Sequence, residues 1–206
     1  MKYFPININL KNKNCLIVGG GEIAFRKAKT LLSCEAKVKL VSPRISPGIK
    51  QLKKNDRFQY HKRRYLVKDL NNIFLAMIAT NDRKINAKIS KDAKKRKILV
   101  NVVDSPDLCD FIVPAIAKYK NLTISICTNG ISPALSKYIR KEVEKKYKGY
   151  ANLLGLLQCY RNKIIKLNER RKRAIWKSII NESFLKKVKN ATRKEIYRLL
   201  IEKIKN

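Results

Sequence analysis

Asn-Cys-Leu-Ile-Val-Gly-Gly-Gly-Glu-Ile-Ala-Phe-Arg-Lys-Ala, residues 14–28, is the stretch that decides how this chain folds. Its apolar run, Cys15–Val18, ends in glycines, which predicts a short strand buried on both faces. Apolar residues then recur at three-to-four spacing as far as Leu32, which predicts a helix directly after the glycines. A strand, a glycine turn and a helix therefore follow one another without a break.

The glycine turn matches the spacing G-x-G-x-x-G/A at Gly19, Gly21 and Ala24. Gly19 permits the tight strand-to-helix turn, Gly21 lets a pyrophosphate approach the backbone, and the small Ala24 lets the helix pack closely on the strand. The free N–H groups of the first helical turn would face the anion. We therefore expect a dinucleotide site, and the alternative is a glycine turn with a purely structural role.

Length and composition limit the class of protein. The 206 residues suffice for one good-sized domain, or for a smaller domain with an appendage. No apolar run reaches the roughly 18 residues that a membrane span needs, and the N-terminus does not resemble a secretory signal. The five cysteines lie far apart without a C-x-x-C pair. We expect reduced thiols in a cytoplasmic protein that has no membrane partner, rather than disulfides or a zinc site.

The formal net charge of +34 suggests a polyanionic partner. The stretch from Lys137 onward carries 22 basic and 6 acidic residues, a net charge of +16, and the remainder carries +18. Because the charge is spread along the whole chain, a solvated, lysine-rich surface explains it without nucleic acid. Electrostatic steering of an anionic small molecule is the functional alternative.

Strands and helices continue to alternate as far as about residue 105, which predicts a Rossmann-like, doubly wound parallel sheet. Strands are expected at 36–41, 58–65, 73–79 and 98–103, helical segments at 49–54 (one or two turns) and 83–95, and a short lead-in strand or edge segment at 3–9. Asn81 or Asp82 would cap the second of these helices. Ligands bind beyond the carboxyl ends of such strands. Gly19–Gly21, 42–44, 80–81 and Asp104 fall at those ends.

The residues after the second expected strand are Ser42-Pro43-Arg44, where many NAD-binding folds place an acidic residue for the ribose. No acidic residue is present there, and Arg44 could instead meet a 2′-phosphate. The choice between NAD and NADP is therefore open on these residues.

Beyond Asp104 the pattern changes. Strands are expected at 111–117 and 122–127, joined by a hairpin turn at 118–121. Ser132 is a suitable N-cap and Pro133 a suitable first residue for a long helix. The rest of the chain is helical in pattern, with a break near 148–149 and apolar periodicity over 150–167 and 173–205.

Several segments together resemble the precorrin-2 dehydrogenase part of siroheme synthase. They are Phe4-Pro5-Ile6, the glycine turn with Arg26-Lys27-Ala28, Ile78-Ala79-Thr80-Asn81-Asp82, Asn101-Val102-Val103-Asp104, Phe111-Ile112-Val113-Pro114-Ala115 and Thr128-x-Gly130-x-Ser132-Pro133. They occur in the order and spacing of that family over residues 1–147. The glycine turn is common to many folds, whereas the 101–104 and 128–133 segments are far more specific.

The resemblance implies NAD-dependent oxidation of precorrin-2 to sirohydrochlorin in siroheme biosynthesis, and in some members insertion of ferrous iron by the same site. It implies an NAD-binding domain over 1–113, a dimerisation segment over 114–149 that makes the protein a homodimer, and a helical domain over 150–206. The methyltransferase domain of longer siroheme synthases is not in this sequence, so we do not expect it to make precorrin-2.

The resemblance also assigns residues. Cofactor contacts match Glu22, Ile23, Pro43, Arg44 and Thr80, in addition to Gly19, Gly21 and Ala24, and the catalytic aspartate matches Asp104. Asn101, Thr128 and Ser132 are candidate substrate-binding residues. Thr128 takes the place of a serine that is phosphorylatable in one branch of the family, and we do not extend that modification to it.

The chemistry of the residues agrees with this assignment. Oxidation of precorrin-2 needs hydride transfer to the nicotinamide and loss of a proton, which a nearby carboxylate such as Asp104 could accept. The alternative is that Asp104 only caps or turns the chain before Ser105. For chelation, no metal ligand is assigned beyond Asp104, because the single histidine, His61, lies in a charged segment and is expected to be exposed.

Two other classes of function remain. A nucleotide-sensing regulatory domain would share the glycine turn but would not need Asp104. A nucleic-acid binder would use the basic C-terminal helices and lose affinity steeply with salt. Neither alternative explains why the segments at 101–104 and 128–133 occur together, so we favour the enzyme.

Overall fold

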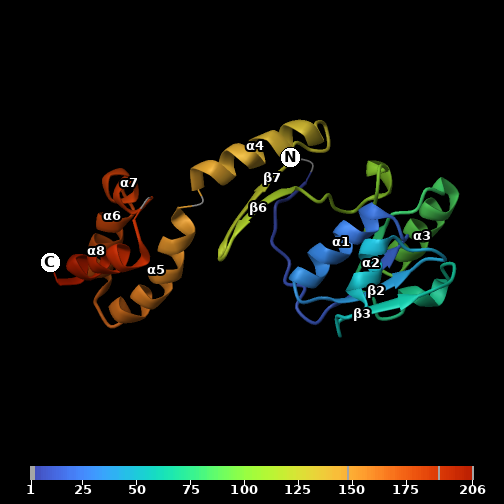
Figure 1. Ribbon diagram of the computed structural model, residues 1–206, viewed down its shortest axis with the longest axis horizontal. Helices are drawn as coiled ribbons and strands as arrows, with labels where there is room; N and C mark the ends of the chain where they lie inside the picture. Colours follow the sequence, from blue (N-terminus) through green and yellow to red (C-terminus); the bar gives the residue numbers. More distant parts are fainter. Residues whose placement is uncertain (1–2, 148, 190, 206) are drawn as a thin grey trace. The chain divides into compact units, whose positions relative to one another are not determined.

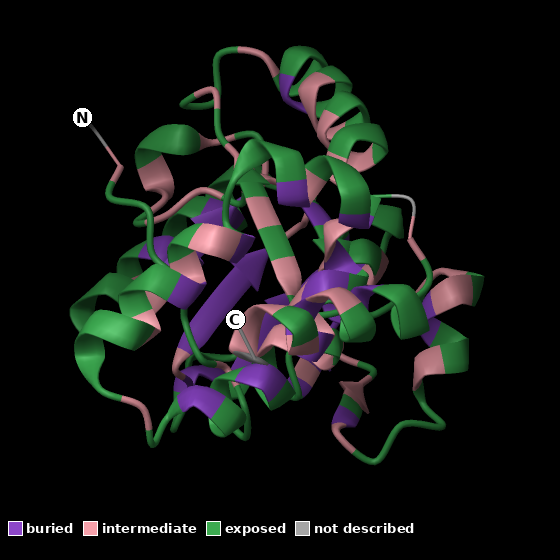
Figure 2. Ribbon diagram, turned by 90° about the vertical axis from the view of Figure 1, so that its left-hand side faces the viewer, coloured by how far each residue is buried: buried purple, intermediate pink, exposed green. Residues whose placement is uncertain are grey.

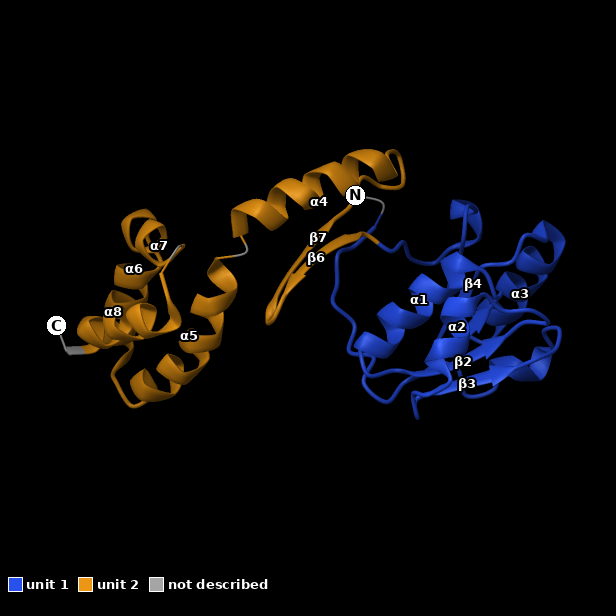
Figure 3. Ribbon diagram, viewed as in Figure 1, with its two compact units in different colours: residues 1–113 blue, residues 114–206 orange. Residues whose placement is uncertain are grey.

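The computed structural model describes residues 3–147, 149–189 and 191–205. Contacts divide the chain into two compact units, residues 1–113 and 114–206 (Figure 3). Within the described parts of the chain, no helix is both long and apolar enough to cross a membrane.

Unit 1 contains a parallel sheet of five strands in the order β3-β2-β1-β4-β5 (Figure 1). The strands are β1 (Asn14–Val18), β2 (Lys37–Val41), β3 (Phe58–His61), β4 (Leu75–Ile78) and β5 (Leu99–Val102). The chain moves from β1 to one side of the sheet and then crosses to β4 on the other side. This reversal next to β1 is the topological switch point at which such sheets bind ligands.

Helices cover both faces of the sheet, which confirms the predicted Rossmann-like fold. They are α1 (Glu22–Ser33), α2 (Pro47–Leu52) and α3 (Arg83–Lys95). The alternation within β1 explains the layers: Cys15 and Ile17 pack in one apolar core with α1 and α2, whereas Leu16 and Val18 pack in the other with α3. In Figure 2 a strand inside the sheet is coloured as buried.

Local signals predicted α3 well. The carboxylate of Asp82 accepts a hydrogen bond from the Ile85 N–H at 3.0 Å, so Asp82 is the N-cap. The buried side of the helix then recurs at Asn86, Ile89, Ser90 and Ala93, the spacing of a helix that packs on a sheet.

Two strand predictions in unit 1 are wrong. Residues 3–9 form no strand, and most of them are exposed, because among the described residues no strand pairs with them. The third strand ends at His61 instead of residue 65. The chain turns away there because Arg63 bonds the carboxylate of Asp69 through two N–H···O contacts of 2.6 and 2.7 Å, and the 3₁₀ turn Val67–Leu70 follows.

Unit 2 begins with an antiparallel hairpin of β6 (Ala115–Tyr119) and β7 (Leu122–Ile126). The predicted first strand began four residues too early, because Phe111 packs against the core of unit 1 instead. Tyr119 pairs directly with Leu122, so the turn contains two residues rather than the predicted four. It is tight because Lys120 adopts a left-handed φ of 49°.

Helix α4 (Pro133–Tyr147) starts where its cap residues predicted, since the Leu135 N–H donates to the Ser132 hydroxyl at 3.2 Å. The remaining helices are α5 (Tyr150–Ile164), α6 (Glu169–Ile179), α7 (Glu182–Lys189) and α8 (Arg193–Lys205). The sequence pattern had suggested two long segments. Asn168 lies between these segments, and Asn181 interrupts the second one. Each side chain accepts an N–H group of the helical turn that follows it. Of the predicted break at 148–149, residue 148 lies outside the described residues.

The helices α5 to α8 share one apolar core of their own, whose fully buried members include Ile164, Ile179, Ile196 and Leu200. Residues 114–149 as a dimerisation segment and 150–206 as a separate domain remain predictions.

Candidate active site

The strand register brings the predicted site residues of unit 1 to one edge of the sheet. Val18 pairs with both Val41 and Ile78, and Ile78 pairs with Val102. The segments that follow these four residues therefore leave the sheet at the same level. They carry the glycine turn, Pro43 and Arg44, Thr80, and Asp104.

The glycine turn after β1 leaves no room for side chains at two positions. Gly19 has a φ of +125°, and a Cβ there would lie 2.1 Å from the carbonyl oxygen of Ala79. A Cβ on Gly20 would lie 1.8 Å from the carbonyl oxygen of Arg44. Sequence reasoning missed Gly20, because the fingerprint treats its position as variable; the run of three glycines was the available signal.

Gly21 differs from its two neighbours. Its φ of −83° is ordinary, and a Cβ built there meets nothing within 4 Å. The backbone at Gly21 therefore faces open space, which is what a pyrophosphate needs for close approach.

Backbone bonds fix the segment after β2 against this turn. Gly19 donates its N–H to Val41 at 3.0 Å, and Ser46 donates its N–H to the Gly20 carbonyl at 2.8 Å. The Ser42 hydroxyl donates to the Arg44 carbonyl at 2.6 Å. The side chains of Pro43 and Arg44 are exposed beside the turn, where a bound nucleotide could reach them.

The N-terminus of α1 completes a cradle for an anion. Gly21 is the N-cap and has no side chain to accept the N–H groups of Glu22 and Ile23, while Ala24 is fully buried against the sheet. Free N–H groups at a helix start attract anions. The buried hydroxyl of Ser46 has no hydrogen-bond partner among the described residues. The residues present therefore fit a dinucleotide.

The side chain and carbonyl of Thr80 are hydrogen-bonded to Asn86 of α3. Its hydroxyl donates to Oδ1 of Asn86 at 2.6 Å, and Nδ2 of Asn86 donates to the Thr80 carbonyl at 3.0 Å. Its side chain thus fixes the turn after β4. Asn86 was missed by the sequence reasoning, although its place three residues before Ile89, on the buried side of α3, marks a polar residue in an apolar position.

Asp104 stands on an unusual backbone. Its φ of +55° is left-handed, a conformation that aspartate tolerates better than most residues. Its side chain is exposed, and within the described part of the chain no side chain or backbone group bonds its carboxylate. Ser105, not Asp104, is the N-cap of the next 3₁₀ turn, Pro106–Leu108. The carboxylate is therefore available for chemistry.

Asn101 is 7% exposed and bonded on both ends of its amide. Nζ of Lys27 donates to its Oδ1 at 2.8 Å, and its Nδ2 donates to the Phe111 carbonyl at 3.0 Å. Burial lowers the pKa of Lys27, and nearby Cys109 and Asp104 partly oppose that effect. Lys27 was missed as a site candidate, although it stands in the Arg26-Lys27-Ala28 segment that takes part in the family resemblance.

Thr128 and Ser132 belong to unit 2, where they shape the turn that precedes α4. The Ser132 N–H donates to the Thr128 hydroxyl at 3.3 Å, and the two hydroxyl groups of Thr128 and Ser136 lie 2.9 Å apart. Asn129 and Gly130 between them both have positive φ. The roles of Thr128 and Ser132 in substrate binding remain predictions.

Other features do not form a second site. Within the described residues no group of three His, Cys, Asp or Glu side chains could hold a metal ion. The prediction of an exposed His61 is wrong: it ends β3 half-buried, and its Nε2 is buried without a partner among the described residues. A hollow of about 440 Å³ lies at the amino ends of β1 and β2, the edge opposite to the one where such sheets bind ligands.

Comparisons with known sequences agree with this geometry. Residues 6–115 match a family described as "Putative NAD(P)-binding", and residues 120–146 match one described as "Sirohaem biosynthesis protein central". Siroheme synthases from Azotobacter vinelandii and Pseudomonas fluorescens are each 34% identical over 207 residues, which cover 99% of this chain and 45% of theirs. The chain thus spans less than half the length of these curated relatives.

A solved structure of "SirC, precorrin-2 dehydrogenase" superposes with a TM-score of 0.79 at 27% identity, covering 97% of this chain and all of that one. This likeness extends over both units, whereas the NAD(P)-binding match covers the first. The protein therefore has the fold of a protein that binds a nicotinamide dinucleotide. It belongs to this NAD(P)-binding family and is related to the precorrin-2 dehydrogenase part of siroheme synthase, as its motifs implied.

Proposed function

We propose that the protein catalyses the NAD-dependent oxidation of precorrin-2 to sirohydrochlorin in siroheme biosynthesis. The observation that carries the proposal is the exposed Asp104 carboxylate, which no described residue bonds, at the same edge of the sheet as the open cradle of Gly21. The similarity to siroheme synthases and to SirC supports the choice of substrate.

In this mechanism the chain has two tasks. The backbone N–H groups at Glu22 and Ile23 bind the pyrophosphate, and Pro43 and Arg44 border the adenosine side. The bound nicotinamide supplies the hydride acceptor. Asp104 accepts the proton that the macrocycle loses, so that one hydride and one proton leave the substrate and NADH and sirohydrochlorin result. The carboxylates of precorrin-2 suit a protein of net charge +34.

We further propose a cytoplasmic homodimer. The two-stranded sheet of β6 and β7 packs against α4 of the same chain. Ile131, Leu135 and Tyr138 around the start of α4 are nevertheless 50% to 86% exposed. A second copy of the chain could cover them. The free thiols of all five cysteines suit the reducing cytoplasm.

The test is an anaerobic assay of the purified protein with precorrin-2, in which sirohydrochlorin formation is followed by absorbance. Parallel reactions contain NAD, NADP or neither, and each is repeated with ferrous or cobaltous ion to test metal insertion. Turnover that requires NAD supports the proposal. Folded protein that binds NADH but gives no turnover with either cofactor would favour a nucleotide sensor instead.

A further inference from the structure

β5 is an edge strand, and residues 105–111 cover its free edge. After Asp104 the chain passes through the 3₁₀ turn Pro106–Leu108 and returns along β5. The Asp110 N–H donates to the Val100 carbonyl at 2.8 Å, and the Val100 N–H donates to Oδ2 of Asp110 at 3.0 Å. This exchange replaces, at one residue, the hydrogen bonds that a sixth strand would supply.

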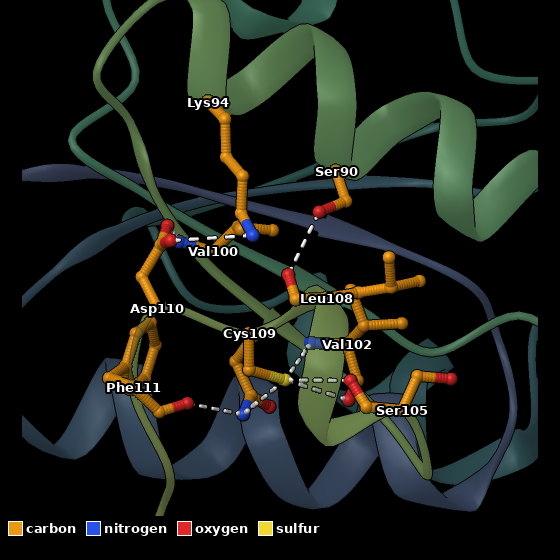
Figure 4. Close-up of polar contacts among 10 residues, drawn as sticks. Ser90, Lys94, Val100, Val102, Ser105, Leu108, Cys109, Asp110 and Phe111 are labelled. Carbon is orange, nitrogen blue, oxygen red and sulfur yellow. Dashed lines mark hydrogen bonds and ion pairs between the residues drawn. The ribbon is translucent and has the colours of Figure 1, made fainter. Parts of the chain in front are cut away.

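The thiol of Cys109 likewise bonds the backbone of Val102, the next residue of β5 whose N–H and carbonyl face the free edge. The Val102 N–H donates to Sγ of Cys109 at 3.1 Å, and the same sulfur lies 3.2 Å from the Val102 carbonyl oxygen and 3.3 Å from that of Ser105 (Figure 4). The thiol proton can therefore be donated to either carbonyl. Cys109 thus joins the last residue of β5 to the residue directly after Asp104.

Neighbouring side chains fix the returning segment from both sides of the sheet. On α3, the Ser90 hydroxyl donates to the Leu108 carbonyl at 2.8 Å, and Nζ of Lys94 lies 3.7 Å from Oδ1 of Asp110 (Figure 4). On the α1 side, the amide of Asn101 donates to the Phe111 carbonyl at 3.0 Å. We call residues 105–111 with these contacts the edge clamp.

The edge clamp acts on the backbone of Asp104 itself. Before Asp104, the Val103 N–H is bound to the Ile78 carbonyl at 2.9 Å, and after it the Ser105 carbonyl faces the Cys109 thiol. Asp104 lies between these two anchored residues with its left-handed φ of +55°. Such a conformation costs free energy and persists only where the surroundings hold it. Among the described residues no group bonds the Asp104 side chain, so its position depends on this backbone.

We propose that Cys109 is a positioning residue, whose thiol holds the Asp104 turn against the end of β5 and so directs the carboxylate toward the substrate. This inference rests on the proposed oxidation of precorrin-2. It assigns a function in catalysis to a side chain that does not touch the substrate, and it explains why a half-buried thiol is bonded to three backbone groups.

The test compares Cys109→Ala, which removes the bonds, with Cys109→Ser, which keeps a donor and an acceptor. Cys34→Ala is the matched control, because Cys34 is an exposed thiol of the same unit. We expect Cys109→Ala to lower kcat in the anaerobic assay at least tenfold, with the KM for precorrin-2 and the Kd for NADH within twofold of wild type. Cys109→Ser should recover kcat to within threefold, and Cys34→Ala should match wild type.

A second measurement needs no turnover. Hydrogen–deuterium exchange over residues 102–109 should accelerate at least tenfold in Cys109→Ala, while exchange in α3 stays as in wild type. If Cys109→Ala does not fold, Ser90→Ala serves instead, because it removes the bond from α3 to the Leu108 carbonyl. It should accelerate exchange over residues 102–109 and lower kcat by two- to threefold.

Wild-type kcat in Cys109→Ala, unchanged exchange over 102–109, or equal loss of kcat in the Ala and Ser variants would each overturn the inference. Failure of the proposed function has a different signature. Wild-type protein would then give no turnover, and the exchange experiment would still decide whether the edge clamp exists.

Discussion

Two turns at the carboxyl edge of the sheet are built in opposite ways. The turn after β1 is fixed by the absence of side chains, since a Cβ at Gly19 or Gly20 would collide with a neighbouring carbonyl. The turn at Asp104 is fixed by side chains, because Cys109 and Asp110 bond the free edge of β5. Both turns contain a left-handed residue.

The difference agrees with the roles that we propose for the two turns. An anion is bound by bare backbone N–H groups, which side chains would obstruct. A proton acceptor must itself be a side chain, so the backbone beneath it has to be held by other residues. Changes in the first turn should therefore alter folding or cofactor affinity, and changes in the second should alter kcat.

The largest effect is expected where the first turn is most crowded. Gly19→Ala places a Cβ 2.1 Å from the Ala79 carbonyl oxygen at a φ of +125°, so either the turn or β4 must move. We expect a loss of about 4 kcal/mol in the free energy of unfolding, measured by urea denaturation. A wild-type unfolding midpoint would show that the glycine turn tolerates side chains.

A substitution in a third turn, after β3, should lower stability without changing cofactor binding or catalysis. The buried carboxylate of Asp69 is bonded by the guanidinium of Arg63 and by the Leu66 N–H. Arg63→Met leaves this charge without its partner. Since Arg63 is one-third exposed, we expect a destabilisation of about 2 kcal/mol. The folded variant should keep the wild-type Kd for NADH and kcat, and a tenfold change in either would contradict this separation.

The same pair predicts a pH dependence. Burial raises the pKa of Asp69, but the bonds from Arg63 and Leu66 outweigh it and hold the pKa below its ordinary value of 3.8. The stabilisation is therefore complete above about pH 3.8 and is lost as the pH falls through the lower, folded-state pKa. The stability difference between wild type and Arg63→Met should shrink between pH 7 and pH 3 in urea titrations. A constant difference would mean that Asp69 is not the group involved.

Gly21→Ala should change binding without changing the fold. A Cβ at Gly21 meets no protein atom within 4 Å but occupies the space proposed for the pyrophosphate. We expect the Kd for NADH, measured by fluorescence titration, to rise about tenfold, or about 1.4 kcal/mol. The unfolding free energy should stay within about 0.5 kcal/mol of wild type. Unchanged affinity would place the dinucleotide elsewhere.

The smallest effect is expected for Thr80→Val, which keeps the shape of the side chain and removes the hydroxyl. That hydroxyl donates to Oδ1 of Asn86 at 2.6 Å and accepts from the Asp82 N–H at 3.2 Å. The loss of these bonds should cost about 1 kcal/mol of stability in urea denaturation, with the Kd for NADH raised less than threefold. A much larger loss of NADH affinity would mean that the hydroxyl contacts the cofactor directly.

The sequence was sufficient wherever a local signal specified the structure. The glycine spacing predicted the turn and α1, and the cap candidates Asn81 and Asp82 predicted the start of α3. The alternation of apolar runs predicted the parallel sheet and thus the edge at which Asp104 lies. These signals are readable because strand and helix periods and cap residues act within a few positions.

The sequence did not predict features that depend on contacts between residues far apart in the chain. Gly20 is required by the Arg44 carbonyl, and the amide of Asn101 is engaged by Lys27 of α1, 74 positions away. Phe111 was predicted to start a strand but packs in unit 1, because its carbonyl and its ring find partners there. No local pattern contains these pairings, so the bonds that support the Asp104 turn could only be seen in the fold.

The most direct test of the account measures kcat and the Kd for NADH on Asp104→Asn and wild type side by side. Asparagine keeps the size of the side chain and tolerates the left-handed φ, so the change removes only the carboxylate that we propose as the proton acceptor. We expect kcat for precorrin-2 oxidation to fall at least about a hundredfold in Asp104→Asn, while the Kd for NADH stays within twofold. A kcat near that of wild type, or an equal loss of NADH affinity, would contradict the assignment of Asp104 as the catalytic residue.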